Sequence, residues 1–478
     1  MLNFRNQKLL GVLVFVGIFC LTPMSANAES LDSVLSSTYL SNPNINAERA
    51  KLRALDEENP RARSGYRPKV NFNADITSQR VKTRPSLPTD GKRRHGGYTV
   101  SLVQPIFRGL RTINSIRKAD ASIYAGREDL RSVEQSIFLD AVTAYVDVIR
   151  DRAILRLRRN NVSVIAEQQR ATDDRFKVGE VTKTDVAQAG ARYSGAVSDL
   201  NLAQANLKTR RAIFEQIIGR SPNGLRRPKG IVKFLPRSLN GSLKRGMDEH
   251  PTILGATYRE ISATHNIHLI RGELLPEINL EGSWTRRYHP TDGVDQQRTG
   301  IIKGTFKMPF YAGGEISARV RQAKQTVLQR RQELQAAKRS VRADVISSWG
   351  QVSSIISQLG ADRSQVSATK TALDGVQEEE KVGQRTVLDV LDAQQEYLDA
   401  QVALAITQRD LVVARYQLLA ATGRLSAVEL GLRVPRYEAS AHYERVERKW
   451  YGTRVEEYND DLENRAIVND RYFPTSYK

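Results

Sequence analysis

One local pattern occurs twice in this chain and limits how the chain can fold. The stretches 177–189 and 381–393 read KVGEVTKTDVAQA and KVGQRTVLDVLDA. Each contains a glycine that can end a helix in the left-handed conformation, then a threonine followed three residues later by an aspartate, which is typical of a helix start. The shared positions are 204 residues apart (383 − 179 = 204): Gly179, Thr182 and Asp185 correspond to Gly383, Thr386 and Asp389. We therefore predict an internal tandem duplication in which each copy contains the tip of a helical hairpin.

This duplication also predicts the domain organisation. Other motifs recur at the same spacing, for example Gln104-Pro105-Ile106-Phe107 and Met308-Pro309-Phe310-Tyr311. Each copy is expected to run helix, two strands, long helix, tip and return helix, with the tips at 177–185 and 381–389. The predicted divisions are a signal peptide at 1–28, a first repeat at 29–230, a second repeat at 231–430, and a C-terminal tail at 431–478 that is equatorial or partly disordered.

The amino terminus predicts export from the cytoplasm. Arg5 and Lys8 precede an apolar run at 9–21, and Ala26-Asn27-Ala28 fits a cleavage site. The only cysteine, Cys20, lies in the removed segment, so the mature chain has no cysteine for a disulfide or a thiolate metal site.

The net charge of +20 raises the question of nucleic-acid binding. Basic residues are spread among acidic ones, however, and no basic block is interleaved with aromatic residues. An exported protein also rarely meets nucleic acid. We therefore expect no nucleic-acid partner and interpret the excess charge as a solvated surface near anionic lipid headgroups or cell wall.

Four segments alternate apolar and polar residues with a period of two, which predicts strands with one apolar face. They are 70–77, 98–104, 278–285 and 301–308. The polar stretches between paired strands, 78–96 and 287–300, are expected to form loops. An ordinary antiparallel sheet lying on a core is one interpretation; the other is a sheet that crosses a membrane, since each strand with its flanks approaches the length required. The side chains then expected to face lipid are Phe72, Ile76, Val100, Leu280 and Trp284.

A membrane-spanning sheet of four strands would need several copies of the chain. No stretch after residue 28 has 18 uninterrupted apolar residues, so no transmembrane helix is predicted. A sheet in lipid must close to pair all its backbone groups, and about eight strands is the practical minimum. Two chains would supply eight strands and three would supply twelve, and arithmetic alone does not choose between them.

Two long helices and two shorter return helices are predicted around the tips. The long ones, 110–177 and 314–381, would each be about 100 Å long at 1.5 Å per residue. The return helices, 183–218 and 386–422, are about half that length. Apolar residues at heptad spacing predict a coiled-coil seam: Val186, Tyr193, Leu200, Leu207 and Phe214, and their equivalents Val390, Tyr397, Leu404, Leu411 and Leu418. Since each return helix covers only half of its partner, another helix, from 31–63 or 239–271, should continue the stack.

The two tips differ in charge, and this difference suggests a functional site. Asp392, one turn beyond Asp389, corresponds to the neutral Gln188, and Arg385 corresponds to Val181. Helix capping explains the shared threonines and aspartates but not these differences. In a ring of copies the two aspartates of each chain would converge on one constriction, and acidic rings select cations. Plain surface charge is the alternative interpretation.

These motifs resemble those of the TolC-like outer-membrane efflux proteins. The resemblance rests on the paired VG-x-x-T-x-x-D tips, VLDVLDA, the Pro-Ile-Phe-x-Gly and Pro-Phe-Tyr-x-Gly-Gly turns and the Asn-Pro and His-Pro helix starts, and it covers about residues 30 to 430. It implies a mixed, mainly α fold in a homotrimer: a long antiparallel α-helical coiled-coil barrel in the periplasm, and a β-barrel in the outer membrane shared between subunits, with four strands per chain and twelve in the trimer.

The same resemblance implies partners and a function. The channel would contact outer-membrane lipid and dock through its tips onto a periplasmic adaptor protein and an inner-membrane pump of the RND, MFS or ABC type. Together these would export drugs and small toxic molecules or, in type I secretion, proteins. No cofactor is implied.

The resemblance also assigns roles to single residues. Asp389 and Asp392 match the acidic pore constriction, and Arg385 and Asp185 match the network that holds the tips closed. A member of that network is a tyrosine in part of the family but Glu380 here, so a Glu380–Arg385 ion pair is the expected replacement. The predicted gate residues are therefore Asp389, Asp392, Arg385, Asp185, Glu380 and Thr184. The predicted adaptor-docking residues are Val178, Gly179, Glu180, Val382, Gly383 and Gln384.

Other classes of protein compete with an export channel. His265 and His268 have helical spacing but no third ligand is evident, so no metal site is predicted. No catalytic or nucleotide-binding motif has a convincing context, so we predict no enzymatic activity. A structural coiled-coil envelope protein without a pore would not need four alternating strands of membrane length. A duct for type I protein secretion alone is a narrower alternative, and the sequence does not identify the substrate, pump or adaptor.

Overall fold

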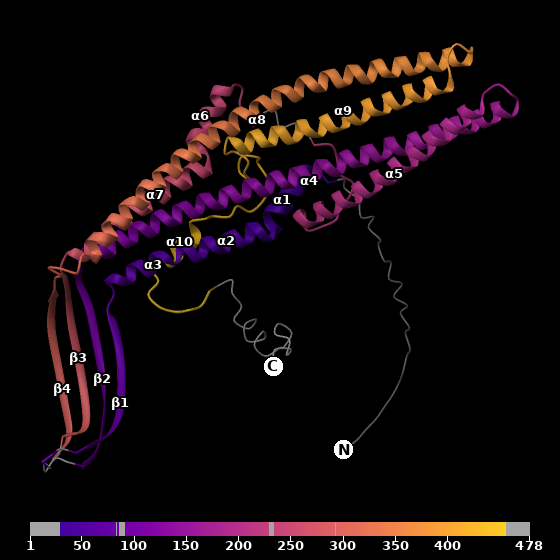
Figure 1. The fold of residues 1–478 in the computed structure, drawn as a ribbon. Helices are drawn as coiled ribbons and strands as arrows, with labels where there is room; N and C mark the ends of the chain where they lie inside the picture. Colours follow the sequence, from indigo (N-terminus) through magenta and orange to yellow (C-terminus); the bar gives the residue numbers. More distant parts are fainter. Residues whose placement is uncertain (1–28, 83, 86–90, 229–233, 292, 456–478) are drawn as a thin grey trace, which may run out of the picture.

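The computed structural model describes residues 29–82, 84–85, 91–228, 234–291 and 293–455. The predicted signal peptide and the end of the tail, from residue 456, lie outside the described residues. Figure 1 shows an elongated chain with two helical hairpins at one end and an antiparallel sheet at the other. The helices are α1 (Leu31–Ser41), α2 (Pro43–Asp56), α3 (Glu58–Arg63), α4 (Arg111–Lys177), α5 (Lys183–Ile218), α6 (Leu239–Glu249), α7 (Pro251–Arg271), α8 (Glu315–Lys381), α9 (Val387–Ala421) and α10 (Ala441–Val446). The strands are β1 (Lys69–Val81), β2 (Gly91–Arg108), β3 (Glu277–Thr291) and β4 (Val294–Lys307).

Helices α4 and α8 set the length of the molecule. Each has 67 residues, which corresponds to about 100 Å. The return helices α5 and α9 have 36 and 35 residues and lie along the halves of α4 and α8 nearer the tips (Figure 1). The predicted bounds of these four helices agree with the structure to within one residue, and their heptad residues are buried or half-buried. In the described part of the chain, no helix is both long enough and apolar enough to cross a membrane.

Other helices cover the halves of α4 and α8 nearer the sheet. Helix α7 lies against both α4 and α8 and thereby joins the two repeats. The hydroxyls of Ser122 on α4 and Ser262 on α7 are 2.9 Å apart, and Arg331 on α8 pairs with Glu260 on α7 at 2.7 Å. Helices α2 and α3 also lie along α4. Helices from both 31–63 and 239–271 therefore continue the packing along α4 and α8, and α7 also bridges the two repeats.

Proline and the residue before it begin α2 and α7 in the same way. Pro43 and Pro251 stand in the first turn, where the missing N–H costs no helical hydrogen bond. The side chains of Asn42 and His250 then accept backbone N–H groups two residues further on, at 2.9 and 3.2 Å. Burial lowers the pKa of His250, which keeps its ring neutral and able to accept this bond.

The four strands form one antiparallel sheet in the order β1-β2-β3-β4. They have 13, 18, 15 and 14 residues and are longer than predicted. Much of the polar sequence expected to form loops continues the strands instead: Arg80 is paired with Lys92, and Arg287 with Gln297. Backbone pairing needs no apolar alternation, so the polar composition concealed these extensions.

The register gives the sheet two chemically different faces. Partners across an antiparallel ladder share a face, and Phe72, Val100 and Trp284 are aligned across β1, β2 and β3. All five side chains predicted to face lipid lie on this face and are exposed in the single chain. The opposite face is polar, and there Arg287 of β3 pairs with Asp75 of β1 at 2.6 Å. We call these the apolar face and the polar face.

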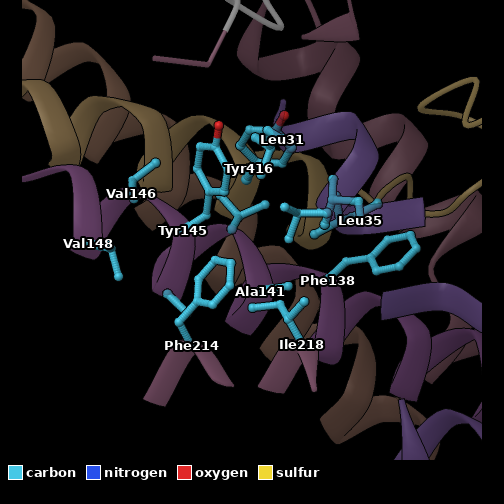
Figure 2. Close-up of a cluster of buried hydrophobic side chains, with 14 of the residues drawn as sticks. Leu31, Leu35, Phe138, Ala141, Tyr145, Val146, Val148, Phe214, Ile218 and Tyr416 are labelled. Carbon is cyan, nitrogen blue, oxygen red and sulfur yellow. The ribbon is translucent and has the colours of Figure 1, made fainter. Parts of the chain in front are cut away.

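The largest apolar core lies where α1, α4, α5 and α9 meet (Figure 2). Its largest members include Leu35, Phe138, Tyr145, Phe214 and Tyr416. The Tyr145 hydroxyl lies 2.6 Å from the carbonyl oxygen of Arg226 and 2.8 Å from that of Glu29, as a donor to both. Burial raises the pKa of Tyr145 to about 12, so the hydroxyl keeps its proton at neutral pH. Tyr145 therefore ties the start of the described chain and the segment after α5 to α4.

The described part of the tail lies along α2, α3 and α4. His442 Nδ1 of α10 lies 3.1 Å from a carboxylate oxygen of the buried Asp56 of α2. The Tyr443 hydroxyl donates to Asp120 of α4 at 3.0 Å. The tail up to Val455 therefore straps α2 and α3 to α4.

Replacing Tyr145 with phenylalanine should destabilise the protein without a cavity. The ring stays in place, but the carbonyl oxygens of Glu29 and Arg226 lose their shared donor, so we expect Tyr145→Phe to lower the free energy of unfolding by about 0.5–1.5 kcal/mol. Denaturant melts in detergent measure this. Tyr416→Phe is the control, because the Tyr416 hydroxyl has no hydrogen-bond partner among the described residues. Equal losses in the two variants would contradict the assigned role of the Tyr145 hydroxyl.

Candidate functional site at the hairpin tips

Each hairpin tip begins with a glycine-terminated helix. Gly179 and Gly383 have φ values of +82° and +78°, in the left-handed region. In both tips, the N–H of the next residue bonds to the carbonyl oxygen five residues earlier, at 3.0 and 2.9 Å. This bond is typical of helices that end at glycine. The local sequence thus reverses the chain within a few residues at the ends of α4 and α8.

The helices that follow both tips start with a reciprocal cap. Asp185 N donates to Thr182 Oγ1 at 3.3 Å, and Thr182 N donates to Asp185 Oδ2 at 2.8 Å. Thr386 and Asp389 repeat the arrangement at 3.2 and 2.9 Å. The bonds from the threonine N–H and hydroxyl lower the pKa of both aspartates, which therefore stay ionised at neutral pH. The predicted caps are confirmed.

The turn residues of both tips are open to solvent. Val178 and Val382, at equivalent positions, are 72% and 71% exposed. A methyl group added at Gly179 or Gly383 would meet no atom within 4 Å. The two tips lie at the end of the molecule farthest from the sheet (Figure 1). The residues predicted to dock an adaptor are therefore accessible, and exposed valines are suited to such a contact.

Two ion pairs, which we call the tip clasp, join the two hairpins of one chain. Arg175 of α4 bonds Glu380 of α8, and Arg192 of α5 bonds Asp392 of α9 at 2.5 Å. The Glu380 side chain is only 10% exposed, so few water molecules can replace this partner. A small apolar cluster packs beside the clasp and includes Ile165, Ala189, Val387 and Leu391. The clasp therefore holds the tips side by side.

The predicted Glu380–Arg385 ion pair does not form within the described chain. Arg385 pairs instead with Glu379 at 2.8 Å, which raises the pKa of its guanidinium. Adjacent residues of a helix point about 100° apart, so Glu379 faces the turn while Glu380 faces α4. Asp185 serves its own cap and Thr184 is exposed. A contact between Arg385 and Asp185 of a neighbouring copy stays a prediction.

Sequence reasoning missed Arg175 and Arg192, although the duplication contains the signal. The equivalent positions in the second copy hold Glu379 and Glu396 (175 + 204 = 379; 192 + 204 = 396). The first tip thus has cations where the second has anions, which makes the hairpins electrostatically complementary. Comparing charge at equivalent positions would have identified both arginines.

A buried ionic cluster attaches the hairpins to each other farther from the tips. Asp147 of α4 accepts a bond from Arg409 of α9 at 2.6 Å and lies 3.4 and 3.3 Å from Arg150 and Arg210. Asp151, one turn along, also pairs with Arg150, at 2.7 Å. Removing one member of such a cluster leaves the others charged and buried, which is costly. Breaking this cluster should therefore cost more free energy than breaking the partly exposed clasp.

Comparison with known proteins identifies the family. Residues 34–220 and 244–424, which lie in the two repeats, match the family described as Outer membrane efflux protein. The chain belongs to this family. As an outer membrane efflux protein it is an exit channel of the outer membrane that extends into the periplasm. In the described residues, no group of three or more His, Cys, Asp or Glu side chains is arranged to hold a metal ion.

Individual outer membrane efflux proteins align with nearly the whole chain. The outer membrane efflux protein BepC of Brucella suis biovar 1 (strain 1330) is 37% identical over 453 residues, 94% of this chain and 98% of BepC. Outer membrane protein TolC of Escherichia coli (strain K12) is 26% identical over 446 residues, 89% of this chain and 88% of TolC. The crystal structure of the Campylobacter jejuni CmeC outer membrane channel shares the fold, with a TM-score of 0.76 and 16% identity over 88% of this chain and 90% of that chain.

Removing the charge of Glu380 should loosen the tips. Glu380→Gln leaves Arg175 without its anionic partner, so we expect backbone hydrogen exchange near residues 378–386 to accelerate about fivefold or more, which corresponds to about 1 kcal/mol. Hydrogen-exchange mass spectrometry measures this. The matched control is Glu378→Gln, because Glu378 is an exposed carboxylate two residues away whose partner is Lys381 of the same helix. If both variants exchange alike, Glu380 does not hold the tips together.

Proposed function

We propose that three copies of this chain form the exit duct of a tripartite export system. The observation that carries this proposal is the placement of two features at opposite ends of one chain. One end is an amphipathic sheet with two unpaired edges, and the other, beyond helices about 100 Å long, is a pair of complementary tips with exposed valines. The tips would dock onto a periplasmic adaptor protein, which connects them to an inner-membrane pump of the RND, MFS or ABC type.

The unpaired edges of the sheet support assembly with further copies. In the described part of the chain, β1 and β4 each pair on one side only. In lipid, the N–H and C=O groups of a free edge would be left without partners. Pairing β4 of one copy with β1 of the next removes every edge when the ring closes. Three copies supply twelve strands, which is the number that the family resemblance implies.

The acidic residues of the second tip are proposed to form the constriction. In a closed trimer, Asp389 and Asp392 of three copies would give six carboxylates around one axis, a ring that attracts cations. Asp389 is held in place by its cap and Asp392 by Arg192. Opening would require the hairpins to separate, so the tip clasp would stabilise the resting state. Arg385 and Asp185 would add contacts between neighbouring copies.

We propose drugs and small toxic molecules as the principal cargo. The relative BepC is named an efflux protein, which favours small molecules over a duct for type I protein secretion alone. Deleting the gene and measuring susceptibility to dyes, detergents and antibiotics tests this, with the secreted proteome measured in parallel. Loss of secreted proteins with unchanged susceptibility would favour the secretion duct.

Neutralising the two acids should reduce cation selectivity. We expect Asp389→Asn/Asp392→Asn to shift the reversal potential in a salt gradient towards zero and to weaken block by multivalent cations, as measured on single channels in planar bilayers. Asparagine keeps an oxygen for the cap, so folding should be preserved. Glu378→Gln, which removes an exposed acid near the same tip but outside the proposed ring, should leave selectivity unchanged. Unaltered selectivity in the double variant would show that these acids only cap and pair.

Distorting the tips should stop export but not assembly. A β-branched residue in the left-handed region costs at least about 1–2 kcal/mol, so Gly179→Val and Gly383→Val should displace the exposed turn. We expect export to fall severalfold while heat-modifiable trimer bands persist. Gly375→Val is the control, since Gly375 lies inside α8 with equally open surroundings. Normal export in both tip variants would mean that the adaptor docks elsewhere.

A further inference from the structure

The far end of the sheet carries a set of cations on its apolar face. We call this set the cationic rim. It consists of Arg80 of β1, Lys92 and Arg94 of β2, Arg286 of β3 and Arg298 of β4.

The strand register places all five on the same face. Arg80 is paired with Lys92, and Arg286 with Arg298 and Tyr98. Each stands an even number of residues from an apolar-face residue of its own strand, such as Trp284 for Arg286. Side chains alternate between faces along a strand, so the cationic rim continues the apolar face towards the end away from the helices.

The two faces differ in how their charges are balanced. On the polar face, Arg287 pairs with Asp75 at 2.6 Å and Lys303 pairs with Glu281 at 3.0 Å. By the same alternation, every carboxylate of the described strand residues lies on the polar face. None of the five rim cations pairs with a carboxylate in the described part of the chain. The described sheet therefore does not neutralise the charge of the rim, which is open to an anionic ligand.

The rim begins at the depth where a lipid headgroup layer would lie. Ile278 and Arg286 are eight residues apart on the apolar face, about 27 Å along the strand. A strand tilt of about 40° reduces this to about 20 Å across the membrane, close to the height of the apolar band of such barrels. Tyr98 and Trp284, with ring centroids 5.6 Å apart, mark the same level, where aromatic residues favour the membrane interface.

Arg286 is the rim residue whose surroundings point most directly to a ligand. Its Nε is buried and has no hydrogen-bond partner among the described residues, although a guanidinium donates strongly. The guanidinium lies over the ring of Tyr288, 5.1 Å from the centroid, which fixes its position. An arginine fixed in this way on a lipid-facing surface is suited to two parallel hydrogen bonds with a phosphate.

We propose that the cationic rim binds phosphate groups of lipid in the outer leaflet of the outer membrane. The helices point into the periplasm, so the opposite end of the sheet lies at the outer leaflet. Polybasic surfaces at this depth attract anionic headgroups. The inference rests on the proposed barrel, since closure of the barrel is what turns the apolar face towards lipid.

Adjacent arginines on opposite faces provide a matched test. The outer variant is Arg94→Gln/Arg286→Gln, and the control is Arg93→Gln/Arg287→Gln, which removes the same charge from the same two strands on the polar face. The purified full-length trimer in detergent is titrated with bis-phosphorylated lipid A, with the same lipid lacking phosphates, and with inorganic phosphate. Native mass spectrometry measures the lipid bound.

We expect the wild type and the control to bind the phosphorylated lipid alike, and the outer variant to bind it about tenfold more weakly. Lipid without phosphates should bind all three proteins equally and weakly, and inorganic phosphate should not displace the lipid at comparable concentration. Equal binding by the outer variant and control, or no preference for phosphates, would overturn the proposal. Absence of trimers in every protein would instead contradict the proposed barrel.

Discussion

The lengths of the helices constrain the rest of this structure. A helix of 67 residues, about 100 Å long, exposes an apolar stripe that its 35- or 36-residue return helix covers only in part. The remaining length must be packed by other helices, and α7 meets this need for α4 and α8 together. One helix of the second repeat therefore packs against the long helices of both repeats and joins them. Helices α2 and α3 add cover to α4, and α6 adds cover to α8.

The same duplication supplies two tips that are alike in backbone and opposite in charge at two pairs of equivalent positions, Arg175/Glu379 and Arg192/Glu396. The capping boxes at Thr182 and Thr386 and the glycine-ended helices give the same turn twice. Charge at equivalent positions then diverges, so that Arg175 and Arg192 of the first hairpin meet acids of the second. Identical tips would repel or ignore each other, whereas complementary tips associate. A partly exposed clasp at the tips and a buried cluster around Asp147 would let the ends part while their attachment holds.

The sheet follows from a different constraint, because its two faces meet different surroundings. On the polar face, carboxylates and cations neutralise one another across the strands. The apolar face carries the aromatic and aliphatic side chains and, at its far end, cations that pair with no acid of the described strands. This asymmetry and the free edges of β1 and β4 have one explanation, a closed barrel with water inside and lipid outside. The charge on the outer face then belongs to the contact with lipid headgroups.

The sequence by itself determined the features that depend on short-range rules. Caps, terminating glycines and heptads located the four main helices to within one residue, and period-two alternation located the four strands. The strand ends were underestimated, because backbone pairing carried the polar segments beyond the apolar pattern. Only the tertiary structure decided which side chains meet: that Glu380 faces Arg175 while Arg385 takes Glu379, and that α7 packs against both long helices. Those choices depend on how helices far apart in sequence rotate against each other, and no local pattern encodes that rotation.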